Sequence, residues 1–186
     1  MNLKTNGYIV QRANANTYHG VEGDNWYLNY ESNNQKFEQY FNEHIDKSWC
    51  DELFVDCCTD LDYLESYISE SRKLNIPCRI ILCETERENP RVVFQGESKV
   101  LGYDYAYAGG SYYSCIYNDI FFKRIPELSD FSLNENGLIS TQEEIKKFIT
   151  RREELEKTMH EQFEEGDFVI YKLSEVIKLR KQSTET

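Results

Sequence analysis

Apolar and polar residues follow two different periods along this chain, and each period predicts one kind of element. Residues 7–12 and 26–31 favour strands, and the second of these alternates apolar and polar positions. The polar residues 13–24 between them predict a loop or hairpin connection. Residues 33–46 place apolar side chains three and four positions apart, which predicts a helix with one face turned toward the core.

Residues 52–84 predict a strand, a helix and a second strand in succession. An apolar strand at 52–58 is followed by Thr59 and Asp62, whose spacing is that of a capping box at the start of a helix. The apolar run 78–83 then predicts the second strand. Because a helix connects the two strands, we expect a βαβ-like unit in which they lie parallel.

The second half of the chain adds three predicted strands and one long helix. The strands are expected at 92–95, 100–107 and 167–173, with Gly96 separating the first two. The helix is expected over 140–165, beginning with a capping box of Ser140 and Glu143 and ending at Gly166. Its inward apolar positions are Ile145, Phe148, Ile149, Leu155, Met159 and Phe163. Arg152 interrupts this apolar stripe, which favours packing against the chain's own core over a coiled coil with a second copy.

These elements predict one α/β domain of mixed α+β character over residues 1–181. A mixed β-sheet with flanking helices, one βαβ-like unit and a long C-terminal helix is the expected architecture. At 186 residues with 40% hydrophobic composition, the chain can bury one proper core but is short for two domains. The polar residues 182–186 are expected to form a loose tail.

Acidic residues exceed basic ones by twelve, and the excess is strongest in residues 51–70. No basic residue interrupts this stretch, so its field repels phosphate backbones and anionic lipids and attracts basic surfaces. Direct nucleic-acid binding and membrane binding are therefore disfavoured. The alternative is an acidic surface that serves solubility alone. The candidate partner-binding residues are Asp51, Glu52, Asp56, Asp60, Asp62 and Glu65.

The sequence carries no recognisable catalytic or cofactor motif. The first twenty residues contain no signal-peptide core and no spanning segment, which indicates a cytoplasmic protein whose six cysteines are reduced thiols. No C-x-x-C or H-x-x-x-H pair supplies adjacent metal ligands, and Glu164 stands where a metalloprotease helix starting at His160 needs its second histidine. We therefore expect no metal, no cofactor and no catalytic residue, and an enzyme is disfavoured.

Six of the fourteen tyrosines lie within residues 103–117, around a glycine pair. On a strand, alternating tyrosines share one face, and the segment after the glycines fits a helix better than a returning strand. The amides at the start of that helix could hold an anion or a substrate carboxylate. A structural role for these tyrosines in the core is the favoured alternative. The candidate ligand-pocket residues are Tyr105, Tyr107, Gly109, Gly110, Ser111 and Tyr112.

A small, acidic, one-domain cytoplasmic α/β protein without a reaction motif resembles, as a class, the immunity proteins that bacteria make against contact-delivered toxins. Residues 101–121 are similar to segments of small uncharacterised bacterial proteins. The resemblance implies a tight complex with a toxin domain, often a basic nuclease, covered by acidic and aromatic residues. We expect an inhibitory binding protein with a basic protein partner; the alternative is a small-molecule binder or enzyme using the Gly109-Gly110 turn.

Overall fold

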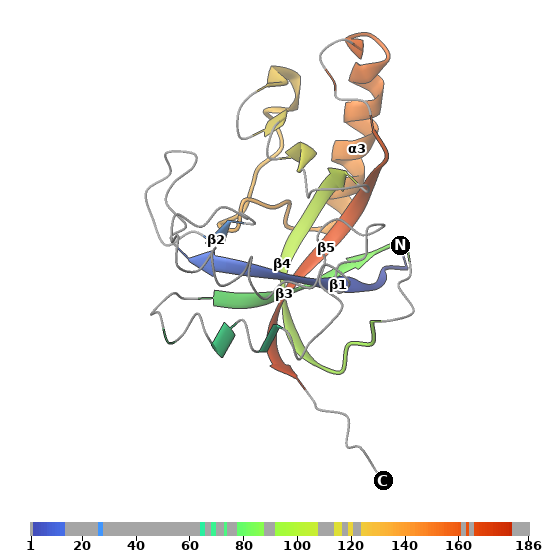
Figure 1. Ribbon diagram of the computed structural model, residues 1–186. Coiled ribbons are helices and arrows are strands. Elements are labelled where there is room, and N and C mark those ends of the chain that lie inside the picture. Colours follow the sequence, from blue (N-terminus) through green and yellow to red (C-terminus); the bar gives the residue numbers. More distant parts are fainter. Residues whose placement is uncertain are drawn as a thin grey trace.

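The structure of the chain is a computed structural model, shown in Figure 1. It describes residues 2–13, 26–27, 64–65, 68–69, 73, 78–87, 92–107, 114–116, 119–120, 124–160, 163 and 166–179, which we call the described part of the chain. Five strands of this part form one sheet in the order β2-β1-β3-β5-β4. They are β1 (Lys4–Ala13), β2 (Trp26–Tyr27), β3 (Cys78–Thr85), β4 (Gly96–Tyr107) and β5 (Phe168–Leu179).

All strand pairings in the described part are antiparallel, so the fold is α+β but this sheet is not the mixed one expected. β3 has β1 on one side and β5 on the other. The strand expected at 52–58, which would make the parallel unit, lies outside the described residues. β5 comes from the end of the chain and inserts between β3 and β4, a long-range pairing that no local pattern predicts.

The sheet is strongly twisted. β5 pairs with β3 only from Lys172 to Glu175, whereas it pairs with β4 along its whole length. In Figure 1, β4 and β5 accordingly run steeply across the direction of β1 and β3. Beyond Glu175, β5 separates from β3 and pairs with the first residues of β4 alone, so these two strands form a ribbon.

Four strand predictions are confirmed within the described residues, at 7–12, 78–83, 100–107 and 167–173. The strand predicted at 92–95 is wrong, because these residues have no regular structure and Gly96 begins β4 instead of separating two strands. A Cβ atom at Gly96 would lie 2.1 Å from the carbonyl oxygen of Lys178, so this close approach of two strands requires glycine.

The long helix is α3 (Gln142–Glu156), shorter than expected at its C-terminal end. Its N-cap is Thr141, whose Oγ1 accepts a hydrogen bond of 3.2 Å from the amide of Glu144. The sequence here fits two overlapping capping boxes one residue apart, and the structure uses the second one. At the other end, the amides of Thr158 and Met159 both donate to the carbonyl of Leu155, which closes the last turn nine residues before the predicted end.

Other helical residues fit the remaining predictions in part. Residues 64–65, 68–69 and 73 are helical, as expected for the helix after Thr59, and Leu64 and Ile68 are buried. After the glycine pair, Cys115 and Ile116 are helical, which agrees with the favoured helix, while Ser114 pairs with Ala106 across an antiparallel bridge. The short 3₁₀ helix η3 (Pro126–Leu128) leads toward α3. The predicted helix 33–46 and the tail 182–186 lie outside the described residues.

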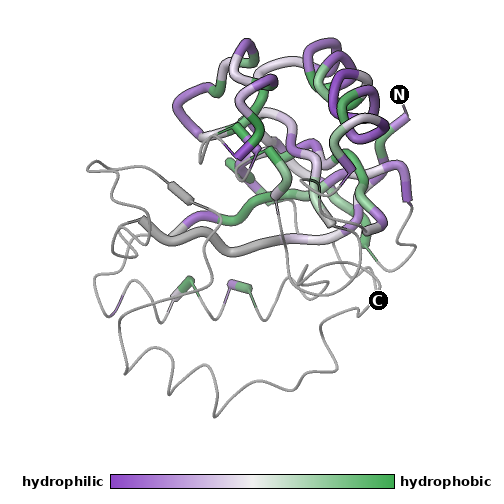
Figure 2. The backbone as a smooth tube through the Cα atoms, turned by 90° about the horizontal axis from the view of Figure 1, so that it is seen from above, coloured by the Kyte–Doolittle hydropathy of each residue, from purple (hydrophilic) through white to green (hydrophobic). Residues whose placement is uncertain are grey.

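Among the described residues, two hydrophobic clusters lie on opposite faces of the sheet. One contains Ile81, Cys83, Ala106, Tyr171 and Leu173, whose register places them on one face. The other lies between α3 and the opposite face of β4 and β5. It includes the predicted inward residues of the helix, namely Ile145, Phe148, Leu155 and Phe163 with Ile149 and Met159 packed against them. Hydrophobic and hydrophilic segments alternate along α3 in Figure 2, as expected for a helix with one buried face.

Candidate functional site

Of the six candidate residues in the acidic segment, only Glu65 belongs to the described part. It is helical and partly exposed. Asp51, Glu52, Asp56, Asp60 and Asp62 lie outside the described residues. In Figure 1, the helical residues 64–65 and 68–69 lie at the opposite end of the molecule from α3. Glu65 therefore lies far from the charged surface of α3.

The negative charge is concentrated in the chain between β1 and β3. Residues 14–77 contain thirteen Asp and Glu against four Lys and Arg, a net charge of −9 out of −12 for the whole chain. The remaining residues contain twenty acidic and seventeen basic side chains and are nearly balanced. Acidity is thus a property of one segment and not of the whole surface.

The sheet anchors both ends of this acidic segment. β1 and β3 are antiparallel neighbours, and Arg12 at the end of β1 lies opposite Cys78 at the start of β3. The segment therefore leaves the sheet and returns to it at the same end of two paired strands. Among the described residues of this segment, only the short strand β2 pairs with the sheet.

Tyr105 is the one candidate pocket residue whose side chain is described, and it packs in the core. The register of β4 places Tyr103 and Tyr105 on one face and Asp104 and Ala106 on the other, as predicted. The Tyr105 ring lies 5.6 Å from that of Phe168. Burial raises the pKa of Tyr105, and the positive charge of Arg152 partly opposes that shift. Residues 109–112 lie outside the described part, and so does the side chain of Tyr107.

A buried ionic cluster centred on Arg152 was not predicted. The Arg152 side chain is 4% exposed, and its Nε lies 3.1 Å from Oδ2 of Asp119, itself 6% exposed. Its Nη1 lies 3.4 Å from Oε2 of Glu156 one turn along α3. The guanidinium also lies 4.9 Å from the ring centre of Phe163 and 5.2 Å from that of Phe168. The ring centre of Tyr105 lies 5.9 Å away, so two carboxylates and three rings surround one buried cation.

One signal for this cluster was present in the sequence. Arg152 stands four residues after Phe148 and three before Leu155, which is an inward position of the helix. An inward arginine requires a buried carboxylate, and Glu156 is visible four residues along. Asp119 is 33 residues away, so its role became apparent only in the folded chain.

A second buried carboxylate, Asp104, fastens the segment after the glycine pair to β4. Its Oδ1 accepts a hydrogen bond of 2.7 Å from the Tyr105 amide and another of 2.7 Å from the Ser114 hydroxyl. Ser114 also bridges Ala106 in the backbone. Asp104 and Asp119 therefore hold two points of the segment 114–120, against β4 and α3 respectively.

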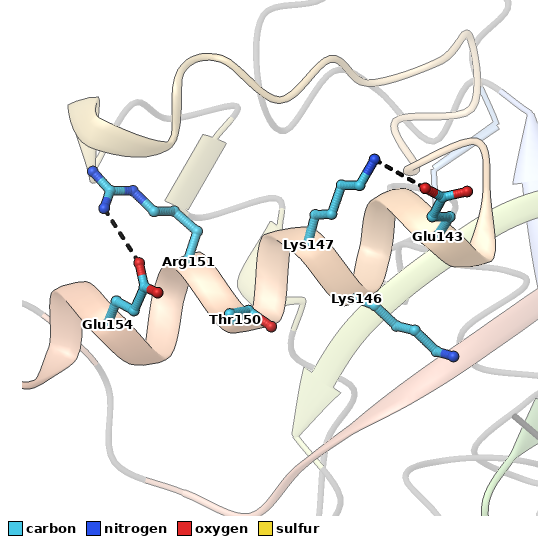
Figure 3. Close-up of a pocket in the computed structure, with 6 residues that line it drawn as sticks. All are labelled: Glu143, Lys146, Lys147, Thr150, Arg151 and Glu154. Atoms are coloured by element: carbon cyan, nitrogen blue, oxygen red, sulfur yellow. Dashed lines mark hydrogen bonds and ion pairs between the residues drawn. The ribbon is translucent and has the colours of Figure 1, made fainter.

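A shallow hollow runs along the outer side of α3 (Figure 3). Its lining residues all come from this helix: Glu143, Lys146, Lys147, Thr150, Arg151 and Glu154. Glu143 pairs with Lys147 at 3.0 Å and Arg151 with Glu154 at 3.5 Å, as Figure 3 shows. Exposed pairs of mixed sign on a single helix are typical of a solvated face, so this hollow is not a built ligand site.

Two further observations concern metals and membranes. In the part of the chain that the structure describes, no three His, Cys, Asp or Glu side chains gather in a group that could hold a metal ion, and the side chains of Cys83 and Cys115 are buried. The described helices also include none with the length and apolar character needed to cross a membrane.

The chain matches no protein-family model, no curated protein sequence and no solved structure.

Proposed function

We propose that this protein is an acidic binding protein that holds a basic protein partner through residues 14–77, in the manner of an immunity-type inhibitor of a toxin domain. The observation that carries the proposal is the segregation of charge: this one segment, anchored at one end of the sheet, holds −9 of the net charge of −12. An acidic surface used for solubility alone has no need of such segregation.

The chemistry of such a complex follows from the carboxylates. A nuclease-like partner has a basic surface that binds phosphates, and the side chains of Asp51, Asp56, Asp60, Asp62 and Glu65 would occupy the positions of those phosphates. Opposite charges accelerate association, and this effect falls with salt because the Debye length shortens from about 10 Å at 0.1 M to about 3 Å at 1 M. In such a complex the chain would be a cytoplasmic, single-domain protein, and the predicted βαβ-like unit 52–84 would present the acidic residues to the partner.

The test compares two variants with the same change of net charge. The first is Asp56→Asn, Asp60→Asn, Asp62→Asn and Glu65→Gln together. The second neutralises four exposed carboxylates of α3, namely Glu143, Glu144, Glu153 and Glu154, by Glu→Gln changes. Each is used as bait in lysate of the source organism at low and high salt, and circular dichroism checks that both fold.

We expect the unmodified chain to capture a basic protein at low salt and to release it at high salt. The first variant should lose that capture, and the α3 variant should retain it. The captured protein's nuclease activity should fall when the unmodified chain is added. Equal loss in both variants, or capture that salt does not weaken, would contradict the proposal.

A small-molecule site at the glycine turn stays a prediction. It can be tested by thermal shift against metabolites and nucleotides, because a ligand at a hundred times its Kd adds about 2.7 kcal/mol of stability.

A further inference from the structure

β4 forms one edge of the described sheet, and among the described residues cover is found only along its second half. Tyr103 exchanges two backbone hydrogen bonds with Ile139, at 2.8 and 3.0 Å, and the carbonyl of Leu101 accepts from Nδ2 of Asn134 at 2.8 Å. Ser114 bridges Ala106 near the end of the strand. By contrast, Glu97, Ser98, Lys99 and Val100 are all exposed. The open edge of the described sheet is therefore the stretch Gly96–Val100.

This stretch belongs to a ribbon of two strands that has separated from β3. Two paired strands alone are marginally stable in water, and stability needs a third strand or a packed face. The ribbon also exposes apolar side chains, with Val100 47% and Ile177 59% exposed. An unpaired edge beside exposed apolar residues is a template for one more strand.

We propose that residues 96–100 pair antiparallel with the same residues of a second copy of this chain, around a two-fold axis at Ser98. This register places Glu97 directly opposite Lys99 of the second copy, and Lys99 opposite its Glu97. Within each chain, Lys99 already lies opposite Glu175 and Glu97 opposite Lys178. The resulting row across the joined sheets reads Glu175, Lys99, then Glu97 and Lys178 of the second copy, with the sign alternating at every step.

The charges select this register among its neighbours. A two-fold axis perpendicular to the sheet requires residues opposite each other to share a face, so the register can shift only in steps of two. A shift in one direction places Glu97 opposite Glu97, and a shift in the other places Lys99 opposite Lys99. Like charges directly opposite each other are destabilising. The central register alone pairs every charge with its opposite.

The interface is small. Five residues from each copy bury far less than the roughly 1,200 Å² of a standard stable interface. The dimer is therefore weak and forms in the upper micromolar range. This inference does not depend on the proposed function, because the edge of β4 lies outside residues 14–77.

Sedimentation equilibrium of the full chain over a wide concentration range tests the pairing. The unmodified chain should show a monomer–dimer equilibrium, and Glu97→Lys or Lys99→Glu should each weaken it about tenfold or more, since each places like charges in two symmetric pairs. A mixture of the two variants should associate again, because both pairs between residues 97 and 99 across the two-fold axis are then of opposite charge. The matched controls are Glu153→Lys and Lys157→Glu, exposed changes of equal charge on or beside α3 that should leave the equilibrium unchanged.

Cross-linking gives a second readout that does not depend on charge. Paired residues at the two-fold axis have Cα atoms about 4.5–5.5 Å apart, within the range of a disulfide. Ser98→Cys should therefore yield a covalent dimer under mild oxidation, whereas Ser140→Cys, exposed before α3, should not exceed the unmodified chain.

Three results would overturn the pairing. They are a chain that stays monomeric at the highest concentration, a dimer that is insensitive to Glu97→Lys and Lys99→Glu, and equal cross-linking by Ser98→Cys and Ser140→Cys.

Discussion

Arg152 and Asp119 form an ion pair of 3.1 Å between Nε and Oδ2 in which both side chains are almost completely removed from water. The pair joins α3 to the segment that follows the tyrosine-rich stretch. Two such charges are tolerated in the interior only together, because each offsets the desolvation of the other.

Removing one partner of this pair should be strongly destabilising. Arg152→Met leaves Asp119 buried without its cation, and we expect a loss of about 3–5 kcal/mol in the free energy of unfolding, measured by urea denaturation. The control Arg151→Met removes an exposed arginine one residue away and should change stability by less than about 0.5 kcal/mol. Adding Asp119→Leu to Arg152→Met should recover part of the loss. Equal effects at positions 151 and 152 would contradict the pairing.

The cap of α3 offers a second matched comparison. Thr141→Ala removes the oxygen that accepts from the Glu144 amide, so it should cost about 1 kcal/mol of stability. Ser140→Ala, one residue earlier and exposed, should change stability by less than about 0.5 kcal/mol. Chemical denaturation of the two variants measures the difference. A greater loss for Ser140→Ala would restore the capping box predicted from the sequence.

Two glycines with positive φ should differ in their tolerance of a side chain. Gly102 has φ +150°, and a Cβ there would lie 2.7 Å from Cβ of Leu138 and 2.9 Å from the carbonyl oxygen of Ile139. Gly137 has φ +71°, with no atom within 4 Å of such a Cβ. Gly137→Ala should therefore cost only the left-handed conformation, about 1 kcal/mol. Gly102→Ala adds steric overlap and should cost about 3 kcal/mol, with thermal unfolding as the measurement. Similar losses would show that Leu138 and Ile139 move aside easily.

Stability at alkaline pH should depend on Tyr8. Burial raises its pKa from 10.0 to about 12, and no hydrogen-bond partner of its hydroxyl lies within the described residues. Because the folded-state pKa lies above the unfolded one, the unfolded chain loses this proton first as pH rises. The protonated Tyr8 hydroxyl therefore contributes its full stabilisation of the folded chain below pH 10, and this stabilisation is lost between pH 10 and about 12.

Tyr8→Phe removes that titration. The urea midpoint of the unmodified chain should therefore fall more steeply between pH 10 and 11 than that of Tyr8→Phe. At pH 8 the variant should be as stable as the unmodified chain or more stable, because it removes a hydroxyl that is buried without a partner among the described residues. Parallel pH profiles of the two proteins would show that the hydroxyl is hydrated.

Local patterns in the sequence were sufficient for elements that bury one regular face. The apolar run of β3 and the alternating tyrosines of β4 report which side chains leave water, and the structure agrees at both places. The stripe from Ile145 to Phe163 likewise identified the buried side of α3. The acidic segment, too, is a property of the sequence alone, since charge can be counted without a fold.

Tertiary structure decided which partner each face meets. β5 pairs with β3 across about ninety residues, in an antiparallel direction that the sequence did not predict. Ser140 and Thr141 each begin a capping box in the sequence, and the backbone geometry of the folded chain selected Thr141 as the cap. Asp119 became the partner of Arg152 only because the fold brings residues 33 positions apart in the chain together. The period of apolar positions and the composition of the chain specify what a side chain must avoid, namely water or an unpaired charge. Which neighbour the side chain meets depends on contacts between residues far apart in the chain.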